Sequence, residues 1–176
     1  MPITAGNGSF YAVTGSFLRL EDRVTMIGRY FEDFTVGETF TSPARTVTEA
    51  DIVMFSAISG DHNPLHTDAE FAKSTPFGQR IAHGLLGLSM ITGLMGRLGV
   101  FEGTAIAFLG LRWRFTAPIF IGDTVHFEMT ISEKRETSKP ERGVLVRGIK
   151  LFNQRGEVVQ EGTMDVMVRR RPGGAG

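Results

Sequence analysis

The sequence predicts a single α+β domain in which a long antiparallel sheet wraps around one central apolar helix. Three observations support this class. The last third of the chain alternates apolar and polar residues with the period of strands, as from Val125 to Ser132. A helical candidate from about Gly84 to Leu98 is apolar around most of its circumference, which is typical of a buried helix. A length of 176 residues suits one domain.

The region before the central helix predicts one strand and two capped helices. Residues 39–45 form a strand-like run. A capping box at residues 48–51 begins a helix that ends at Gly60, where a glycine suits the left-handed cap. After a loop, a second box at Thr67 predicts a short helix that continues to Lys73.

Four strands follow the central helix, with turn residues between them. Within the helix, each glycine costs about 1 kcal/mol relative to alanine. We therefore expect close packing against the helix backbone at Gly87, Gly93 and Gly96. The predicted strands cover residues 109–115, 125–131, 144–152 and 158–168.

The two ends of the chain differ from the region between them. Residues 1–25 are rich in Gly, Ser and Thr and have weak periodicity, so we expect a flexible N-terminal extension. The patterned domain then covers residues 26–170, with Met26 as a candidate natural start. We expect residues 171–176 to form a frayed tail.

The composition excludes several classes of function. The 19 basic and 19 acidic residues balance, which argues against a nucleic-acid partner. The absence of cysteine removes disulfides, thiolate metal sites and cysteine nucleophiles, and it suits a reducing compartment. The longest uncharged apolar stretch, residues 81–96, is shorter than the roughly 20 residues that span a bilayer. With no secretory signal at the start, we expect a cytoplasmic protein with no membrane partner.

The loop after Gly60 contains the first candidate chemistry. Asp61 and His66 lie five residues apart, and a carboxylate with an imidazole can together activate a water molecule. Pro64 stiffens the loop, while Asn63 can hydrogen-bond the local backbone. Spacing alone leaves a second interpretation open, in which Asp61 forms a turn and His66 lies on the surface.

The start of the central helix is the second candidate. A helix N-terminus presents unpaired N–H groups, and Gly84 would let a ligand approach them, as an oxyanion site requires. The alternative is that Gly84 only packs tightly, while His83 caps the helix or binds a buried carbonyl. The sequence has no metal-binding motif and no nucleotide-phosphate loop, so we expect no metal and no cofactor.

These two segments resemble the MaoC-like dehydratases, a family that includes (R)-specific enoyl-CoA hydratases. Residues 60–68 match the family pattern Gly-Asp-x-Asn-Pro-[Ile/Leu]-His-x-Asp, and residues 81–84 match Ile-[Ala/Val]-His-Gly. The similarity covers roughly Tyr30 to Arg169. The resemblance implies a hot dog fold, a homodimer or higher oligomer, and an acyl-CoA thioester substrate without a cofactor.

The resemblance also implies an activity and a set of site residues. The activity is addition of water to trans-2-enoyl-CoA to give (R)-3-hydroxyacyl-CoA, or the reverse dehydration. A hot dog thioesterase and a non-catalytic acyl-thioester-binding module are the alternatives. The implied catalytic residues are Asp61 and His66. The implied oxyanion and substrate-binding residues are Gly84, Asn63, His83 and Thr92, the last at a position where the family commonly has Ser.

Overall fold

The structure is a computed structural model that describes residues 28–173. The expected extension over residues 1–25 lies outside the described residues, and the expected tail over 171–176 is described only as far as Gly173. In the described part, a short 3-10 helix, η2 (Phe31–Asp33), precedes the first strand. No helix there is long and apolar enough to cross a membrane.

The sheet has six strands, and every pairing between them is antiparallel. Along the sheet the order is β1-β4-β5-β6-β3, with β2 also pairing with β4. The four long strands that the alternating pattern predicts are confirmed. The strands are β1 (Thr39–Thr41), β2 (Arg45–Thr46), β3 (Ala105–Phe115), β4 (Thr124–Glu136), β5 (Arg142–Phe152) and β6 (Val158–Arg169).

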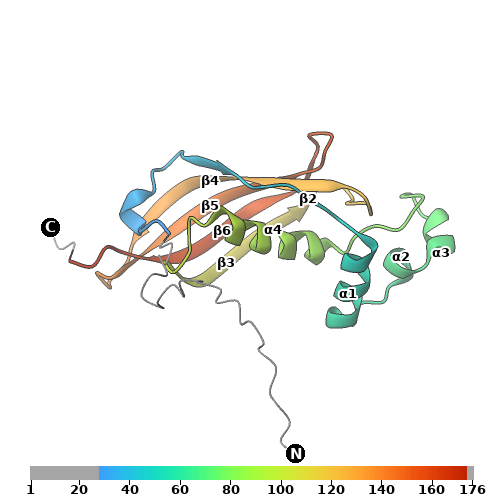
Figure 1. Ribbon diagram of the computed structural model, residues 1–176, viewed down its shortest axis with the longest axis horizontal. Coiled ribbons are helices and arrows are strands. Elements are labelled where there is room, and N and C mark those ends of the chain that lie inside the picture. The colour runs from blue at the N-terminus through green and yellow to red at the C-terminus, as the bar shows by residue number, and fades with distance from the viewer. Residues whose placement is uncertain (1–27, 174–176) are drawn as a thin grey trace, which may run out of the picture.

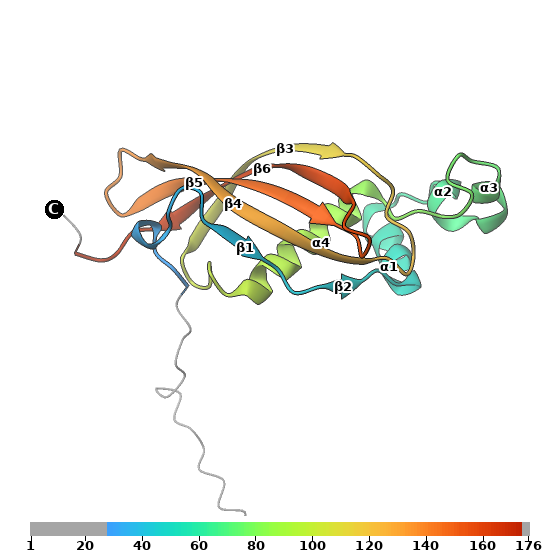
Figure 2. The ribbon, with the colours of Figure 1, turned by 90° about the horizontal axis from the view of Figure 1, so that it is seen from above.

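Helix α4 (Gly84–Leu98) packs along one face of this sheet, and the long strands curve around it (Figures 1 and 2). The period-2 pattern places alternate residues of β4 against the helix, and four of them are fully buried. They are Val125, Phe127, Met129 and Ile131. The predicted fold class is therefore confirmed, since one sheet wraps one central helix as the resemblance implied.

Helix α4 differs from its prediction because it is buried on one face only. Leu86, Met90 and Leu94 are buried, whereas Leu85 is 57% exposed. A single sheet packs against the helix, and residues 28–173 place no second layer over its opposite face. Close packing is confirmed at Gly87. The prediction of close packing is wrong for Gly93 and Gly96, where an added Cβ would meet nothing within 4 Å.

The predicted strand at residues 39–45 is divided into β1 and β2. Pro43 lies between them and has no N–H to donate to a ladder. The hydroxyl of the adjacent Ser42 accepts a hydrogen bond of 2.9 Å from the backbone N–H of Phe127 on β4. Both short strands therefore pair with β4, and the ladder is interrupted between them.

Three further helices lie together beyond one end of the sheet (Figure 1). The capping box before α1 (Glu49–Ser59) is confirmed, and Gly60 ends the helix with a φ of 74°. The predicted loop contains a short helix, α2 (Pro64–Thr67). The predicted cap at Thr67 is wrong, because the carboxylate of Asp68 accepts the first amides of α3 (Ala69–Lys73).

Candidate active site

The turn that carries the candidate acid and base is held by local hydrogen bonds. The Asp61 carboxylate accepts the backbone N–H of Asn63 at 3.2 Å, and the Asn63 side chain accepts the N–H of Leu65 at 3.0 Å. Pro64 occupies the first position of α2, where its missing N–H costs nothing. The turn therefore has one defined shape, and it directs His66 inward, where this residue is buried.

The buried ring of His66 has a defined tautomer. Its Nδ1 lies 2.8 Å from the carbonyl oxygen of Ile81. Because a carbonyl only accepts hydrogen bonds, Nδ1 carries the hydrogen in the neutral ring. The lone pair is therefore on Nε2, which is the nitrogen available to take a proton.

A second imidazole stacks on the first. His83 is 2% exposed, and its ring centroid lies 3.8 Å from that of His66. Its Nε2 lies 3.0 Å from the backbone oxygen of Asp61 and 3.2 Å from the hydroxyl of Ser56 on α1. Because the backbone oxygen of Asp61 can only accept a hydrogen bond, Nε2 of His83 carries the hydrogen. Nδ1 of His83 is then a buried acceptor, and it has no hydrogen-bond partner within residues 28–173.

The carboxylate and the two imidazoles form one compact group. One ligating atom each from Asp61, His66 and His83 lies within 4.8 Å of the others. Such a trio could hold a metal ion. A carboxylate beside an imidazole can equally hold and activate a water molecule.

A cavity of about 300 Å³ lies beside His66 and the start of α4. Most of its lining is apolar, with His66 and Gln160 as the polar exceptions among longer side chains. A cavity of this type suits an acyl chain whose reacting end lies beside the imidazole. The lining residues are His66, Phe77, Ile81, Ala82, Gly84, Phe115, Thr116, Ala117, Pro118, Ile119 and Gln160.

Gly84 is the first residue of α4, so its amide belongs to the unpaired N–H groups of the helix N-terminus. These amides carry partial positive charge, which favours an oxygen that gains negative charge. An added Cβ would lie 2.9 Å from the ring of Phe115, so a side chain here would compete for the space over the helix start. Gly84 and His66 line the same cavity, as the oxyanion interpretation requires.

The family of the chain follows from this site together with the sequence match. A family model described as the MaoC like domain matches residues 33–149. The chain belongs to this family.

Two relatives and one solved structure illustrate how far the similarity to MaoC-like proteins extends. The chain is 40% identical over 123 residues to protein MaoC of Klebsiella aerogenes, covering 69% of this chain and 36% of that protein. It is 34% identical over 146 residues to the (R)-specific enoyl-CoA hydratase of Rhodospirillum rubrum, covering 83% of this chain and 96% of that protein. The crystal structure of the MaoC-like dehydratase from Rhodospirillum rubrum matches with a TM-score of 0.76 at 32% identity, covering 82% and 99% of the two chains.

Two predicted site residues of this MaoC-like chain have other contacts. The Asn63 side chain caps α2, so it shapes the turn. The exposed Thr92 donates its hydroxyl hydrogen to the carbonyl of Ser89 within α4. The hydroxyl that contacts an imidazole belongs to Ser56 instead, 27 residues before His83 in the chain. Nothing in the pattern of α1 distinguishes Ser56 before the fold is known.

Sequence reasoning also missed Gln160 on β6. This side chain is 2% exposed, and its amide donates to the carbonyl of Gly84 at 3.0 Å while its oxygen accepts from Trp113 at 3.1 Å. It fits because Gly87 has no side chain, since an added Cβ would lie 2.5 Å from the Gln160 amide nitrogen. Gln160 thus fixes the first turn of α4 against the sheet. A polar residue amid the apolar pattern of β6 was the available signal.

Proposed function

We propose that this MaoC-like protein adds water to trans-2-enoyl-CoA to give (R)-3-hydroxyacyl-CoA, and that it catalyses the reverse dehydration. The observation that carries this proposal is the meeting of the Asp61 carboxylate, the His66 imidazole and the N-terminus of α4 beside one apolar cavity. The relative from Rhodospirillum rubrum, whose length this chain covers almost entirely, is named for the same reaction.

The mechanism starts with the thioester oxygen directed at the amide of Gly84. A water molecule lies between the carboxylate of Asp61 and Nε2 of His66, which takes one proton while the oxygen forms a bond to C3 of the substrate. The π electrons of the C2–C3 bond move toward the thioester carbonyl, which becomes an enolate. The helix amides stabilise the negative charge on the enolate oxygen. Return of the proton to C2 completes the addition of one water molecule. Dehydration follows the same steps in reverse.

The roles of the two imidazoles differ in this mechanism. His66 moves the proton, because its Nδ1 is engaged by Ile81 and its Nε2 is unengaged. His83 immediately precedes Gly84 and holds the turn through its contact with the Asp61 backbone. Its buried Nδ1 offers an acceptor for the hydrogen of a water molecule or substrate hydroxyl at the edge of the site.

We also propose that the active form is a homodimer joined along β3. In this chain β3 pairs only with β6, so its other edge is unpaired among the described strands. Several of its apolar side chains are exposed: Phe108, Leu109 and Leu111 are between 44% and 57% exposed. A long apolar edge strand is a site for pairing with another chain. Light scattering after size-exclusion chromatography tests this, and Leu109→Lys should shift the population toward monomer.

The activity is tested with trans-2-butenoyl-CoA in two simultaneous assays. Loss of the conjugated absorbance reports hydration, and a thiol reagent reports released CoA. We expect absorbance loss without thiol release, and chiral analysis should identify the (R) product. Thiol release at the same rate would identify a thioesterase. Tight acyl-CoA binding in calorimetry without turnover would identify a binding module.

A further inference from the structure

The backbone of Ile81 links the candidate base to the rest of the fold. Its carbonyl accepts Nδ1–H of His66 at 2.8 Å, and its N–H donates to the carbonyl of Leu65 at 3.4 Å. The tautomer of His66 therefore depends on where the Ile81 peptide lies. Whatever holds Ile81 in place also determines which nitrogen of His66 is basic.

Ile81 is held in turn by the connection between β3 and β4. Ile81 forms an antiparallel bridge with Phe120, and the N–H of Ala82 donates to the carbonyl of Ile119 at 2.8 Å. The connection also forms one wall of the cavity through Pro118 and Ile119. Movement of this connection would therefore displace both the cavity wall and the hydrogen-bond acceptor of His66.

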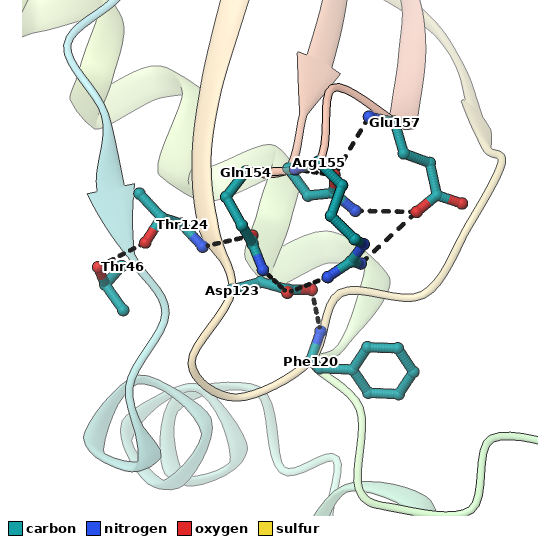
Figure 3. Close-up of polar contacts among 8 residues, drawn as sticks. Thr46, Phe120, Asp123, Thr124, Gln154, Arg155 and Glu157 are labelled. Carbon is teal, nitrogen blue, oxygen red and sulfur yellow. Dashed lines mark hydrogen bonds and ion pairs between the residues drawn. The ribbon is translucent and has the colours of Figure 1, made fainter.

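A buried carboxylate fixes this connection (Figure 3). Asp123 is 3% exposed, and one of its oxygens accepts the N–H of Phe120 at 2.9 Å. The other oxygen accepts hydrogen bonds from the Gln154 amide at 2.7 Å and the Arg155 guanidinium at 3.2 Å. A carboxylate removed from water is stable only when it is paired and hydrogen-bonded. Asp123 thus joins the β3–β4 connection to the turn between β5 and β6.

That turn is itself rigid. The side-chain oxygen of Asn153 accepts the N–H groups of Arg155 and Glu157 at 3.0 and 3.1 Å. The guanidinium of Arg155 lies between two carboxylates, 3.2 Å from Asp123 and 3.5 Å from Glu157. These two ion pairs therefore fix the orientation of the Arg155 guanidinium toward Asp123.

We propose that Asp123 and Arg155 are a positioning pair for His66, acting through Phe120 and Ile81. The proposal rests on the catalytic role given to His66 above. Neither residue touches the cavity, so the pair acts only through the connection, on the geometry of the base and on the cavity wall that Pro118 and Ile119 form. The ion pair keeps the Ile81 carbonyl against Nδ1, and through it keeps the lone pair of His66 on Nε2.

The test compares Arg155→Met with Arg135→Met. Both arginines are about half exposed, at 51% and 49%, and each lies between two carboxylates. Arg135 contacts Glu133 and Asp165 on the sheet, and among residues 28–173 it makes no hydrogen bond to the Ile81 segment, so it controls for loss of a surface ion pair. Mutations that change coupling between distant groups alter rates by roughly two- to thirtyfold. We expect kcat to fall in that range for Arg155→Met with a smaller rise in KM, because the connection also lines the cavity, while Arg135→Met keeps wild-type kcat and KM.

Three further measurements complete the test. Arg155→Lys should recover part of the kcat, because it restores the charge. The Nδ1–H proton signal of His66 in NMR spectra should exchange faster in Arg155→Met than in Arg135→Met. Where Arg155→Met folds poorly, Gln154→Leu removes one contact to Asp123 and keeps the ion pair, with the same direction expected.

Equal kcat and equal proton exchange in the two methionine variants would overturn the positioning role. A wild-type protein without hydratase activity would instead reject the proposed function. The NMR comparison would still report whether Asp123 and Arg155 hold His66 in place, so the two failures are distinguishable.

Discussion

The two ends of α4 bury polar groups in different ways. At the start of the helix, each of two stacked imidazoles binds a backbone carbonyl through one nitrogen, and the His66 ring also lines a cavity. Just beyond the other end, Arg147 is 4% exposed, donates Nε–H to the carbonyl of Met164 at 3.4 Å and lies 5.1 Å from the ring centroid of Phe101.

The difference separates a site from a structural contact. Burial lowers the pKa of Arg147 from its usual value to about 10, because the charged form loses its water. Its surroundings include an aromatic ring, one carbonyl and the charge of Asp165, which offsets part of the cost of burial. The His66 ring instead lines a cavity of about 300 Å³ while its Nδ1 binds the Ile81 carbonyl, so proton transfer through Nε2 is feasible there.

The largest effect is expected from removing the carboxylate or the base. Asp61→Asn and His66→Ala should each lower kcat by about 10²–10⁴-fold, the usual contribution of a positioned acid or base. Asp61 is exposed, so Asp61→Asn should keep the wild-type melting temperature. Turnover with trans-2-butenoyl-CoA and thermal unfolding measure the two quantities. Near-normal turnover in either variant would remove these residues from the mechanism.

A smaller effect is expected from a methyl group in the first turns of α4. In Gly87→Ala the new Cβ would meet the Gln160 amide at 2.5 Å and Ile119 at 2.8 Å, so Gln160 must leave Gly84. We expect a loss of about 1–3 kcal/mol in the free energy of unfolding, together with a lower kcat.

Gly93→Ala on the same helix is the matched control. Its Cβ would meet nothing within 4 Å, so the better helix propensity should stabilise the chain by up to about 1 kcal/mol. Chemical denaturation measures both variants. Equal stability changes would show that Gln160 does not fix the helix start.

A still smaller effect on kcat is expected from removing the Ser56 hydroxyl beside His83. Ser56→Ala removes one contact of Nε2 but leaves the one to the Asp61 backbone, so kcat should fall less than tenfold. Ser89→Ala removes an exposed hydroxyl that binds only its own helix, and it should leave kcat unchanged. Thr92→Val should resemble Ser89→Ala. A greater loss for Thr92→Val than for Ser56→Ala would return the supporting role to Thr92.

The smallest effect on activity is expected at the other end of the helix. Arg147→Met should keep kcat within twofold, and it should leave the free energy of unfolding unchanged or raise it, because a buried cation is replaced by an apolar side chain. The pKa of Arg147 is lower in the folded chain, so the cost of burying its charge is complete below pH about 10 and fades as the pH rises above that value. Denaturation at pH 7 and pH 9 should therefore show the same difference from wild type. A marked loss of kcat would show that the two ends are coupled.

Most of the fold could be predicted because its signals are local. The alternation in β4, the capping box of α1 and the left-handed glycine at residue 60 each depend on residues within one turn or strand. The errors arose where a longer-range contact decided the outcome. Helix α4, predicted to be buried around most of its circumference, is exposed on one face because no other part of the described chain covers that face.

The sequence by itself determined that Asp61 and His66 share one stiff turn, since Asn63 and Pro64 shape it through neighbouring atoms. Only the tertiary structure decided which nitrogen of His66 is basic and what supports the site. The Ser56 contact spans 27 residues of chain and the Gln160 contact spans 76. Such contacts form when the sheet closes around α4, and no periodicity or spacing along the chain encodes which distant side chain will arrive.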